Sequence, residues 1–413
     1  MKNTFLSEMN SRGFLNQCTD LEGLRKILNQ KAIKAYIGFD TTASSLHVGS
    51  LMQIMILRLL QKYGHQPIVL LGGGTTLIGD PSGKESTRKI LKEKEIKNNI
   101  QSIKKIFEKL LYTKNKKMKP IFVNNYDWLG KLKYIDFLRD VGKHFTINKM
   151  LTFDSVKLRL GREQSLSYME FNYMILQAYD FYQLFKNHNC ILQLGGSDQW
   201  GNIVNGVELI RRILQENAFG LTTPLITLSS GAKMGKTEKG AVWLDKKIYS
   251  PYDYWQFWRN TADEDVVKFL KYFTEIEINE LSDLTRTEKD INKLKILLAN
   301  EATKILHGSK LAKESAETAT ETFIQRGVGK NIPEKKVFRN LIEKGIDIVE
   351  FAFQNGTSLS KSEIRRILRN KGIKINDQTV VDEKKIINFK DFGNENFVKL
   401  SIGKKTHIKV KII

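Results

Sequence analysis

The chain has 413 residues, of which 41% are hydrophobic and 27% charged, and its formal net charge is +22. This length exceeds one ordinary hydrophobic core, so we expect two or three domains. No uninterrupted apolar run is long enough to cross a bilayer, which argues against a membrane protein. The first 18 residues contain no continuous apolar stretch, so we expect no secretory signal.

The two cysteines, Cys18 and Cys190, lie far apart without metal-ligand spacing. We expect buried thiols in a reducing cytoplasm. The positive charge favours a polyanionic partner such as a nucleic acid. A general enrichment in Lys, Ile and Asn is the competing explanation, so the position of the charge counts for more than its sum.

The first informative stretch joins a strand to a helix. Residues 32–39 form an apolar, β-prone run, and apolar residues recur at helical spacing from Leu51 onward, so a strand should end near Asp40 and a helix begin near His47. Such a junction exposes backbone N–H groups to an anion such as phosphate. Thr42 and His47 are candidate donors, and Gly38 and Gly49 allow close approach of a ligand to the backbone. A lone His47 could equally be a capping residue.

A second strand is expected over residues 67–71, directly before three glycines, Gly72, Gly73 and Gly74. A glycine cluster at the carboxyl end of a strand suits a ligand lying over the backbone, with Asp80 as a partner for an ammonium group. A purely structural turn is the alternative. The lysine-rich residues 84–119 are interpreted as a solvated helical face.

A third strand over residues 120–123 precedes a helix expected over 167–185. On that helix Tyr173, Gln177 and Asp180 lie at positions i, i+4 and i+7, beside a separate apolar stripe. A phenol, an amide and a carboxylate aligned in this way favour a lined pocket, although each residue alone could be an ordinary one.

A fourth strand over 190–194 ends in another polar loop, which contains Gly195, Asp198 and Gln199. Asp198 could simply cap a helix. Strands that alternate with helices and repeatedly end in polar loops indicate an α/β fold with a doubly wound parallel sheet. Further on, Lys233 and Lys236 lie among glycines in a cationic loop that could close on phosphates, unless it is an exposed basic hairpin.

Four regions are expected along the chain: a catalytic domain over 1–245, a helical domain over 246–325, a linker over 326–345 and a small basic domain over 346–413. In the last region Ser360 and Glu363 form a capping box that begins a helix. Strands should follow from residue 373, with a final hairpin turning near Gly403. The basic face of the helix suits structured RNA, unless it is only a solvated face. Its residues are Lys361, Arg365, Arg366 and Arg369.

Taken in order, these motifs resemble those of bacterial-type tyrosyl-tRNA synthetases, which are class I aminoacyl-tRNA synthetases, over essentially the whole chain. The matching blocks are residues 36–40, 47–50, 78–83, 176–181, 195–201 and 233–237. The resemblance implies a Rossmann-like catalytic domain, a helical domain that binds tRNA, and a tail similar to the RNA-binding domain of a small-subunit ribosomal protein.

The resemblance also implies a role for each matching residue. Tyr36 and Asp180 would bind the phenol of tyrosine, and Asp80, Tyr173 and Gln177 its ammonium group. The ribose and the reacting groups would lie near Asp40, Asp198 and Gln199, and the nucleotide would lie near Gly38, Gly49, Ser50 and Gly195. Thr42 and His47 would contact the ATP phosphates, and Lys233, Lys236 and Thr237 would close over the pyrophosphate. Lys84 and Arg88 are further candidates there.

The implied reaction activates L-tyrosine with ATP, brought as its magnesium complex, and then transfers the tyrosyl group to tRNA(Tyr). A carboxylate is already a nucleophile, so positioning and charge stabilisation suffice without a general base. No spacing of carboxylates suggests a protein-bound metal. A cytoplasmic homodimer is implied as well.

Two departures from the family pattern concern the nucleotide: Ser50 replaces the usual second histidine, and Ile37 replaces a frequent cysteine. The alternatives are a tryptophanyl enzyme, a small adenylyltransferase with a similar His-x-Gly loop, and a non-catalytic RNA-binding protein. Tyr36 together with Asp180 favours a phenol over an indole.

Overall fold

A computed structural model describes residues 4–80, 91–162, 165–231, 234–237, 240–323, 333–356, 359–392, 396–403 and 406–413. The chain forms two compact units. One comprises Met1–Met234 with Lys268–Arg286, and the other comprises Gly235–Val267 with Thr287–Ile413. None of the described helices is long and apolar enough to cross a membrane.

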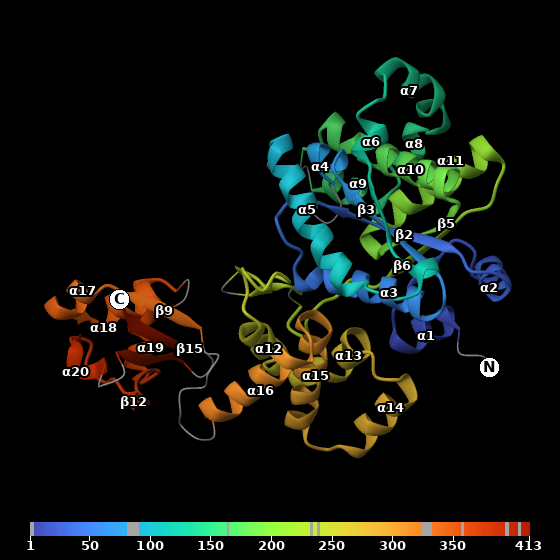
Figure 1. Ribbon diagram of the computed structural model, residues 1–413. Coiled ribbons are helices and arrows are strands. Elements are labelled where there is room, and N and C mark those ends of the chain that lie inside the picture. Colours follow the sequence, from blue (N-terminus) through green and yellow to red (C-terminus); the bar gives the residue numbers. More distant parts are fainter. Residues whose placement is uncertain are drawn as a thin grey trace. The chain divides into compact units, whose positions relative to one another are not determined.

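The first unit is built on a six-stranded sheet (Figure 1), in which five strands are parallel and β1 pairs antiparallel with β6. In spatial order the strands are β1 (Gln17–Cys18), β6 (Phe219–Thr223), β5 (Cys190–Gly196), β2 (Lys34–Asp40), β3 (Gln66–Gly72) and β4 (Ile121–Asn124). The chain moves outward from β2 to β3 and β4, and then returns to the other side of β2 as β5 and β6. This arrangement confirms the predicted Rossmann-like, doubly wound sheet.

Helices cover both faces of this sheet. Helices α3 and α5 pack together beside β3, whereas α10 and α11 pack together against β5. The pleat of β2 separates the two faces: the Phe39 ring contacts Phe107 of α5, and the Tyr36 ring contacts Phe181 of α10. Tyr36, Gly38 and Asp40 therefore share the α10 face, because alternate residues of a strand point the same way.

The α-helices that lie wholly in this unit are α1 (Phe5–Arg12), α2 (Leu21–Gln30), α3 (Leu51–Lys62), α4 (Thr75–Ile78), α5 (Glu93–Leu110), α6 (Tyr126–Leu129), α7 (Tyr134–Asp140), α8 (Ile147–Met150), α9 (Asp154–Gly161), α10 (Tyr168–His188) and α11 (Trp200–Leu214). Short 3₁₀ segments are η1 (Val48–Ser50), η2 (Lys116–Met118), η3 (Gly142–His144) and η4 (Ser197–Gln199). Helix α10 begins at a capping box made by Ser167 and Glu170, and ends at Asn189, whose φ is +52°.

Two short strands of this sheet were not predicted. Strand β6 is buried at every residue and β1 has two residues. Neither offers the alternation of apolar and polar residues that marks a half-buried strand. Their place in the sheet comes from backbone pairing with each other and with β5.

The second unit begins with helices. Helices α12 (Pro251–Arg259), α15 (Ile291–His307) and α16 (Ser309–Phe323) pack on one another. Helix α12 starts with Ser250 as N-cap and Pro251 in the first turn. Helices α13 (Asp263–Phe273) and α14 (Ile278–Thr287) cross the division between the units, and β7 (Lys236–Thr237) pairs with β8 (Gly240–Ala241).

The C-terminal part of the second unit has its own apolar core, to which nineteen buried residues between Val337 and Val410 contribute. Its five-stranded sheet has the order β12 (Gln378–Thr379), β11 (Ile373–Ile375), β14 (Phe397–Ile402), β15 (Thr406–Ile412) and β9 (Glu334–Val337). Strand β10 (Ile346–Asp347) pairs with β13 (Ile386–Ile387). The helices are α17 (Arg339–Lys344), α18 (Ile348–Asn355), α19 (Lys361–Arg369) and α20 (Phe389–Phe392).

The folded part of this region begins earlier than predicted. Residues 334–344 fall in the expected linker over 326–345, yet they form β9 and α17, and β9 pairs in parallel with β15. The sequence Glu-Lys-Lys-Val of β9 buries only its valine, so the segment reads as polar. Its structure depends on a partner strand more than 70 residues away.

Candidate active site

The candidate active site lies at the carboxyl ends of the parallel strands, where β2 and β5 are neighbours and their chain connections run in opposite directions. Ligands of doubly wound sheets bind at such a switch point. Because β2, β3, β4 and β5 are parallel, the loops that follow these strands all begin at this edge. They bring together side chains separated by more than 150 residues.

At one end of the site a carboxylate is buried beside a phenol. Asp180 of α10 and Tyr36 of β2 are each only 1% exposed. The Asp180 carboxylate accepts hydrogen bonds from Asn125 Nδ2 at 2.9 Å and from the indole nitrogen of Trp128 at 2.7 Å. The Tyr36 hydroxyl is buried and has no hydrogen-bond partner among the described residues. An unpaired buried hydroxyl is costly, so it marks a position where a ligand can supply the missing partner.

The protonation of this pair follows from its burial. Desolvation raises the pKa of Asp180 to about 7, against the opposing hydrogen bonds from Asn125 and Trp128. Burial, reinforced by the nearby Asp180, also raises the pKa of the Tyr36 phenol, which therefore keeps its proton as a donor. The site thus offers one donor and one acceptor to a ligand hydroxyl.

A hydrogen-bonded chain of polar side chains forms the middle of the site. The Gln199 amide donates to Asp80 Oδ2 at 3.0 Å, and Asn202 Nδ2 donates to Gln177 Oε1 at 3.0 Å and to Gln199 Oε1 at 3.1 Å. Asp80, Gln177 and Gln199 are thereby connected, although they come from three separate segments. A carboxylate and amide oxygens at one place can hold an ammonium group.

Asp40 ends β2 on the same face as Tyr36. Its Oδ1 accepts hydrogen bonds from Thr75 Oγ1 at 3.1 Å and from the Tyr173 hydroxyl at 3.3 Å. A Cβ atom at Gly72 would lie only 2.7 Å from this oxygen and 2.6 Å from Thr75 Oγ1. The glycine that ends β3 is therefore required for these two residues to meet.

The other end of the site is the loop between β2 and α3. His47 caps η1, with its Nδ1 accepting a hydrogen bond from the Gly49 backbone at 3.0 Å. A Cβ atom at Gly49 would lie 2.6 Å from His47 Cε1 and 3.1 Å from the Met234 carbonyl oxygen. Thr42 is exposed, and Ser50, the N-cap of α3, makes no side-chain capping bond. The predicted strand end at Asp40 and helix start near His47 are confirmed.

The remaining predicted residues lie in β5, in η4, in β7 or outside the described residues. Gly195 lies in β5 and Asp198 in η4, and a Cβ atom on Gly196 would lie 2.5 Å from Asp198 Oδ1. Lys84, Arg88 and Lys233 lie outside the described residues. Lys236 and Thr237 form β7, which pairs with β8, and only their backbone is described.

The basic helix predicted in the C-terminal part is confirmed as α19. Its capping box joins Ser360 and Glu363, and its apolar side buries Ile364 and Leu368. Its basic residues are exposed; they are Lys361, Arg365, Arg366 and Arg369. Two of the four make ion pairs, Lys361 with Glu350 and Arg369 with Glu383.

Sequence reasoning missed Thr75, Asn125, Trp128 and Asn202. Asn125 and Trp128 directly follow β4, so the rule that pointed to the ends of the other strands would have found them as well. Asn125 also holds the glycine loop, since its Oδ1 accepts from the Gly74 backbone at 2.7 Å and its Nδ2 donates to Thr75 at 3.0 Å.

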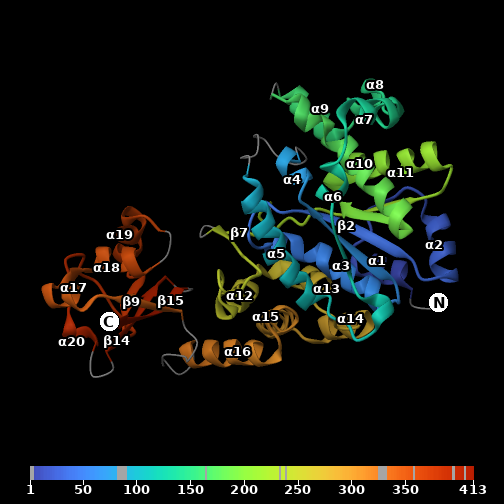
Figure 2. The same cartoon turned by 45° about the horizontal axis from the view of Figure 1, so that its top comes forward.

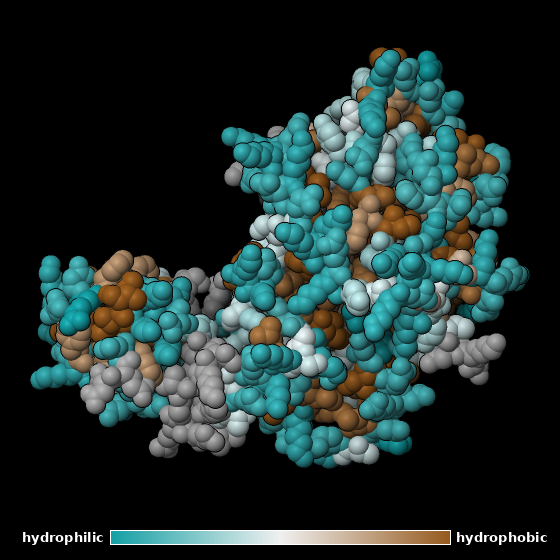
Figure 3. Space-filling view, in the orientation of Figure 1, coloured by the Kyte–Doolittle hydropathy of each residue, from teal (hydrophilic) through white to brown (hydrophobic). Residues whose placement is uncertain are grey.

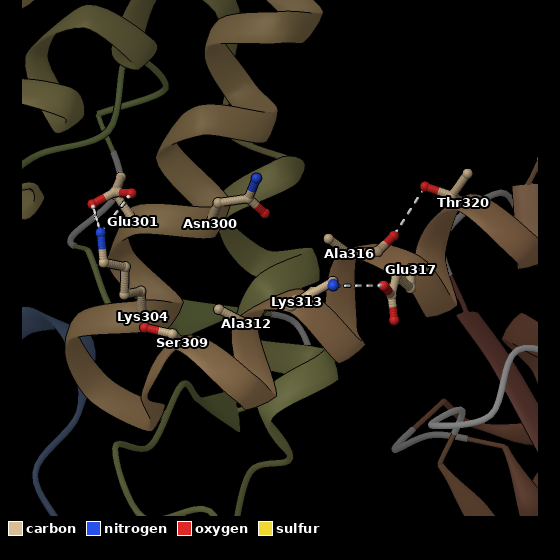
Figure 4. Close-up of a pocket in the computed structure, with 9 residues that line it drawn as sticks. All are labelled: Asn300, Glu301, Lys304, Ser309, Ala312, Lys313, Ala316, Glu317 and Thr320. Carbon is tan, nitrogen blue, oxygen red and sulfur yellow. Dashed lines mark hydrogen bonds and ion pairs between the residues drawn. The ribbon is translucent and has the colours of Figure 1, made fainter.

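A separate hollow of about 500 Å³ lies between α15 and α16. Figure 4 shows that its charged residues pair along their own helices: Lys304 with Glu301, and Lys313 with Glu317. Among the residues described, no cluster of three or more His, Cys, Asp or Glu side chains is suited to a metal ion.

Comparisons with known proteins agree with this geometry. Residues 28–324 match the family described as tRNA synthetases class I (W and Y). The tyrosine–tRNA ligase of Pelagibacter ubique (strain HTCC1062) is 61% identical over 411 residues, covering 100% of both chains. That of Rickettsia typhi (strain ATCC VR-144 / Wilmington) is 53% identical, covering 99% of this chain and 100% of the relative.

Among solved structures, a C-terminally truncated mitochondrial tyrosyl-tRNA synthetase from Aspergillus nidulans aligns with a TM-score of 0.70 and 30% identity. The alignment covers 78% of this chain and 95% of that one. The full-length identity to bacterial relatives and the match to the family model lead to one conclusion: the chain belongs to the bacterial-type tyrosyl-tRNA synthetases, within class I.

Proposed function

We propose that this chain is a tyrosine–tRNA ligase in which Tyr36 and Asp180 select the amino acid. The observation that supports this most strongly is the unpaired buried hydroxyl of Tyr36 beside the Asp180 carboxylate. The phenol of tyrosine would donate to Asp180 and accept from Tyr36. Phenylalanine would leave both groups unpaired in a buried pocket, which is costly; tyrosyl-tRNA synthetases are the established example of such discrimination.

Asp80, Tyr173 and Gln177 would hold the ammonium group of tyrosine. This assignment is supported by the chain of hydrogen bonds through Gln199 and Asn202 and by the hydrogen bond from Tyr173 to Asp40. These bonds fix the acceptors before the substrate arrives, which lowers the entropy cost of binding. The tyrosine carboxylate would then point toward the loop between β2 and α3.

In the first step a carboxylate oxygen of tyrosine attacks the α-phosphorus of ATP, and the bond to pyrophosphate breaks. Thr42 and His47, with Lys233, Lys236 and Thr237, would stabilise the negative charge that grows on the phosphates, helped by Lys84 and Arg88. Asp40, Asp198 and Gln199 would position the ribose, and Gly38, Gly49, Ser50 and Gly195 would allow the nucleotide to approach the backbone. Magnesium enters with ATP as part of the substrate.

In the second step a hydroxyl of the terminal ribose of tRNA(Tyr) attacks the tyrosyl carbonyl carbon, and AMP leaves. The basic face of α19 would contact the tRNA backbone. We infer that the domain boundaries follow this division of labour: activation by residues 1–245, and tRNA binding by the helices to residue 325 and by the C-terminal domain. The cytoplasm is the expected location.

We also infer a homodimer. Several large apolar side chains between β4 and α10 are exposed, and Figure 3 shows apolar surface over this end of the first unit. They are Tyr126, Tyr134, Ile135, Leu138, Ile147, Leu151, Leu160 and Tyr168. A second copy of the chain would cover them. Sedimentation of an Ile135→Glu variant as a monomer, with the wild type as a dimer, is the expected result; a monomeric wild type would contradict this inference.

Exchange of pyrophosphate into ATP tests the function directly. Exchange should depend on tyrosine and fail with phenylalanine and tryptophan. Exchange with tryptophan alone would assign the chain to the tryptophanyl branch, and no exchange with RNA binding retained would indicate a non-catalytic protein. Removing residues 333–413 should preserve exchange and abolish efficient charging of tRNA, because the C-terminal sheet, β9 included, is a separate core.

A further inference from the structure

The C-terminal sheet domain exposes aromatic side chains on a surface that is distinct from the basic face of α19. Phe338, which caps α17, is 63% exposed, and Phe389, at the start of α20, is 38% exposed. Figure 2 shows α19 and α20 at opposite ends of this domain. We call the surface formed by Phe338, Arg339 and Phe389 the aromatic patch.

Within the patch, Arg339 contacts Phe389, and Phe338 is the residue that precedes Arg339 in the chain. The guanidinium carbon of Arg339 lies 5.4 Å from the centre of the Phe389 ring, in a cation–π arrangement. The backbone nitrogen of Arg339 donates to the Ile413 carbonyl at 3.1 Å, so the position of α17 is fixed by the last strand. Arg339 also pairs with Glu343 at 3.2 Å, an exposed contact that adds little energy.

Apolar surface continues around the patch. Leu341 and Ile386 are exposed as well, and Figure 3 shows apolar side chains gathered over the end of this domain that includes α17. Exposed apolar surface of this kind usually marks a binding site. The chemistry of its border indicates what binds there.

The border of the patch is mainly basic. Lys335 and Lys336 lie in β9, separated from Phe338 by Val337, while Lys344 ends α17 and Lys390 follows Phe389; all four lysines are exposed. Over residues 331–413 the sequence has 18 Lys and Arg against 10 Asp and Glu, a net charge of +8. Exposed aromatic rings with a stacked arginine, surrounded by lysines, match the pattern that binds unpaired bases and their phosphates.

Cation–π contacts occur at three places in the described part of this domain. Besides Arg339 with Phe389, Lys361 lies over Phe353 and Lys409 over Phe397. Rings paired with cations keep a positive charge beside the apolar face, which suits a base and its phosphate better than an apolar protein segment.

We propose that the aromatic patch stacks unpaired nucleobases of RNA. This proposal rests on the proposed function, because tRNA binding by a tyrosine–tRNA ligase supplies the RNA partner. The basic face of α19 would hold the backbone of structured RNA, and the patch would add contacts to bases that are not in a helix. Stacking does not distinguish bases by their hydrogen-bonding edges, so its sequence preference should be weak.

The test uses the full-length protein and a single-stranded RNA oligonucleotide that carries 2-aminopurine, whose fluorescence is quenched on stacking. Phe338→Leu keeps an apolar side chain and removes the ring, so affinity should fall about tenfold and quenching should be lost. Phe338→Trp should restore both. Val381→Ala, at another exposed apolar residue of this domain, is the matched control and should change neither.

The salt dependence of RNA binding distinguishes the contribution of the Phe338 ring from that of the Arg339 charge. Arg339→Gln should lower the slope of log Kd against log salt by about 1, the amount expected for one lost phosphate contact. Phe338→Leu should leave that slope unchanged. Tyrosine-dependent exchange should stay at the wild-type rate in every variant. If the wild type shows no exchange while 2-aminopurine quenching still depends on Phe338, the proposed function fails and the patch stands.

Three results would overturn the proposal. The first is equal RNA affinity for Phe338→Leu and the wild type. The second is a Tm several degrees lower in Phe338→Leu, which would assign the ring to packing within the chain. The third is a loss of concentration-dependent self-association in the same variant with RNA binding unchanged, which would assign the face to contact between protein copies.

Discussion

At the amino acid end of the site, the Asp180 carboxylate receives hydrogen bonds from Asn125 and Trp128 and is almost fully buried. At the nucleotide end, Thr42 is exposed and Ser50 makes no capping bond. The end that we propose binds the amino acid is therefore built before its ligand arrives, and the end that we propose binds the nucleotide is a more exposed loop. Preorganised buried groups give discrimination, because a wrong ligand leaves them unpaired, whereas open loops adapt to charge that appears only during reaction.

The difference has a structural origin. The amino acid end lies between a central strand and a 21-residue helix, α10, which are fixed by the core. The nucleotide end depends on one loop, in which His47 and Gly49 fold onto each other. We therefore expect substitutions at the first end to change which substrate is used, and those at the second to change how fast the adenylate forms.

The largest effect is expected for Asp180→Ala. Leaving a buried polar group unpaired costs about 1–3 kcal/mol, and more where a group is charged, so kcat/KM for tyrosine in exchange should fall about 10²- to 10³-fold. The preference for tyrosine over phenylalanine should largely disappear, because the acceptor for the phenol is gone. Asp127→Ala, at the exposed residue beside Trp128, is the control and should behave as wild type. An unchanged tyrosine preference would contradict the assignment.

Gly49→Ala should affect the other end. The added methyl group meets His47 and the Met234 carbonyl, so the loop must shift, and misplacement of reacting groups by about 1 Å costs roughly 10²-fold in rate. We expect kcat to fall by this factor, with the tyrosine Kd from equilibrium binding unchanged. Gly161→Ala, where a Cβ meets nothing within 4 Å, is the control. Equal loss of tyrosine binding would show that the two ends are not separate.

Gly38→Ala examines the surface between the two ends. Gly38 is exposed in the middle of β2, and a Cβ there would make only an ordinary contact of 3.6 Å with Leu70. The fold has room for the methyl group, so Tm should not change. A ligand lying over the strand would not have room, and overpacking by one methyl group should raise the KM for tyrosine or ATP about tenfold. Unchanged kinetics would show that the substrates do not cross this surface.

The pH dependence concerns the amino acid end alone. The pKa of Asp180 is about 7 in the free protein, and the ionised form is the acceptor for a phenol. Tyrosine affinity should therefore rise as pH increases from 6 to 8, by up to about tenfold for a single titration. Folding stability changes in the opposite direction: a raised pKa favours the folded state at low pH, and this contribution is lost as pH rises through 7. Asp180→Asn should abolish both trends, as measured by calorimetric titration and thermal unfolding.

The sequence predicts the parts of this site that depend on local patterns. The ends of β2, β3 and β5 are marked by apolar runs followed by glycine and polar residues, and each lies where expected. The alignment of Tyr173, Gln177 and Asp180 on α10 is likewise a matter of helical period. The hydrogen-bond partners of these three residues do not follow from the helical period. Tyr173 contacts Asp40, Gln177 contacts Asn202, and Asp180 contacts Asn125 and Trp128.

What the sequence does not reveal depends on pairing between distant segments. Strand β6 has no pattern of its own and is defined by its neighbours β1 and β5. Strand β9 looks like part of a linker until β15 pairs with it. The position of Asn125 after a strand can be read from the sequence, but its simultaneous contacts with Gly74, Thr75 and Asp180 cannot. Such roles follow from three-dimensional proximity, which a single sequence does not encode by spacing.

The smallest effect is expected for Ser50→His, which restores the residue usual in the family. Ser50 begins α3, and its side chain makes no capping bond that the substitution would remove, so the fold should tolerate it. An imidazole reaches further than a hydroxymethyl group and can donate a hydrogen bond to the nucleotide, worth about 1 kcal/mol. The KM for ATP should fall about fivefold, with the KM for tyrosine unchanged. If the KM for ATP does not change, the open nucleotide end of this chain must obtain that contact from another residue, and the separation of the two ends would then rest on the Asp180 and Gly49 variants alone.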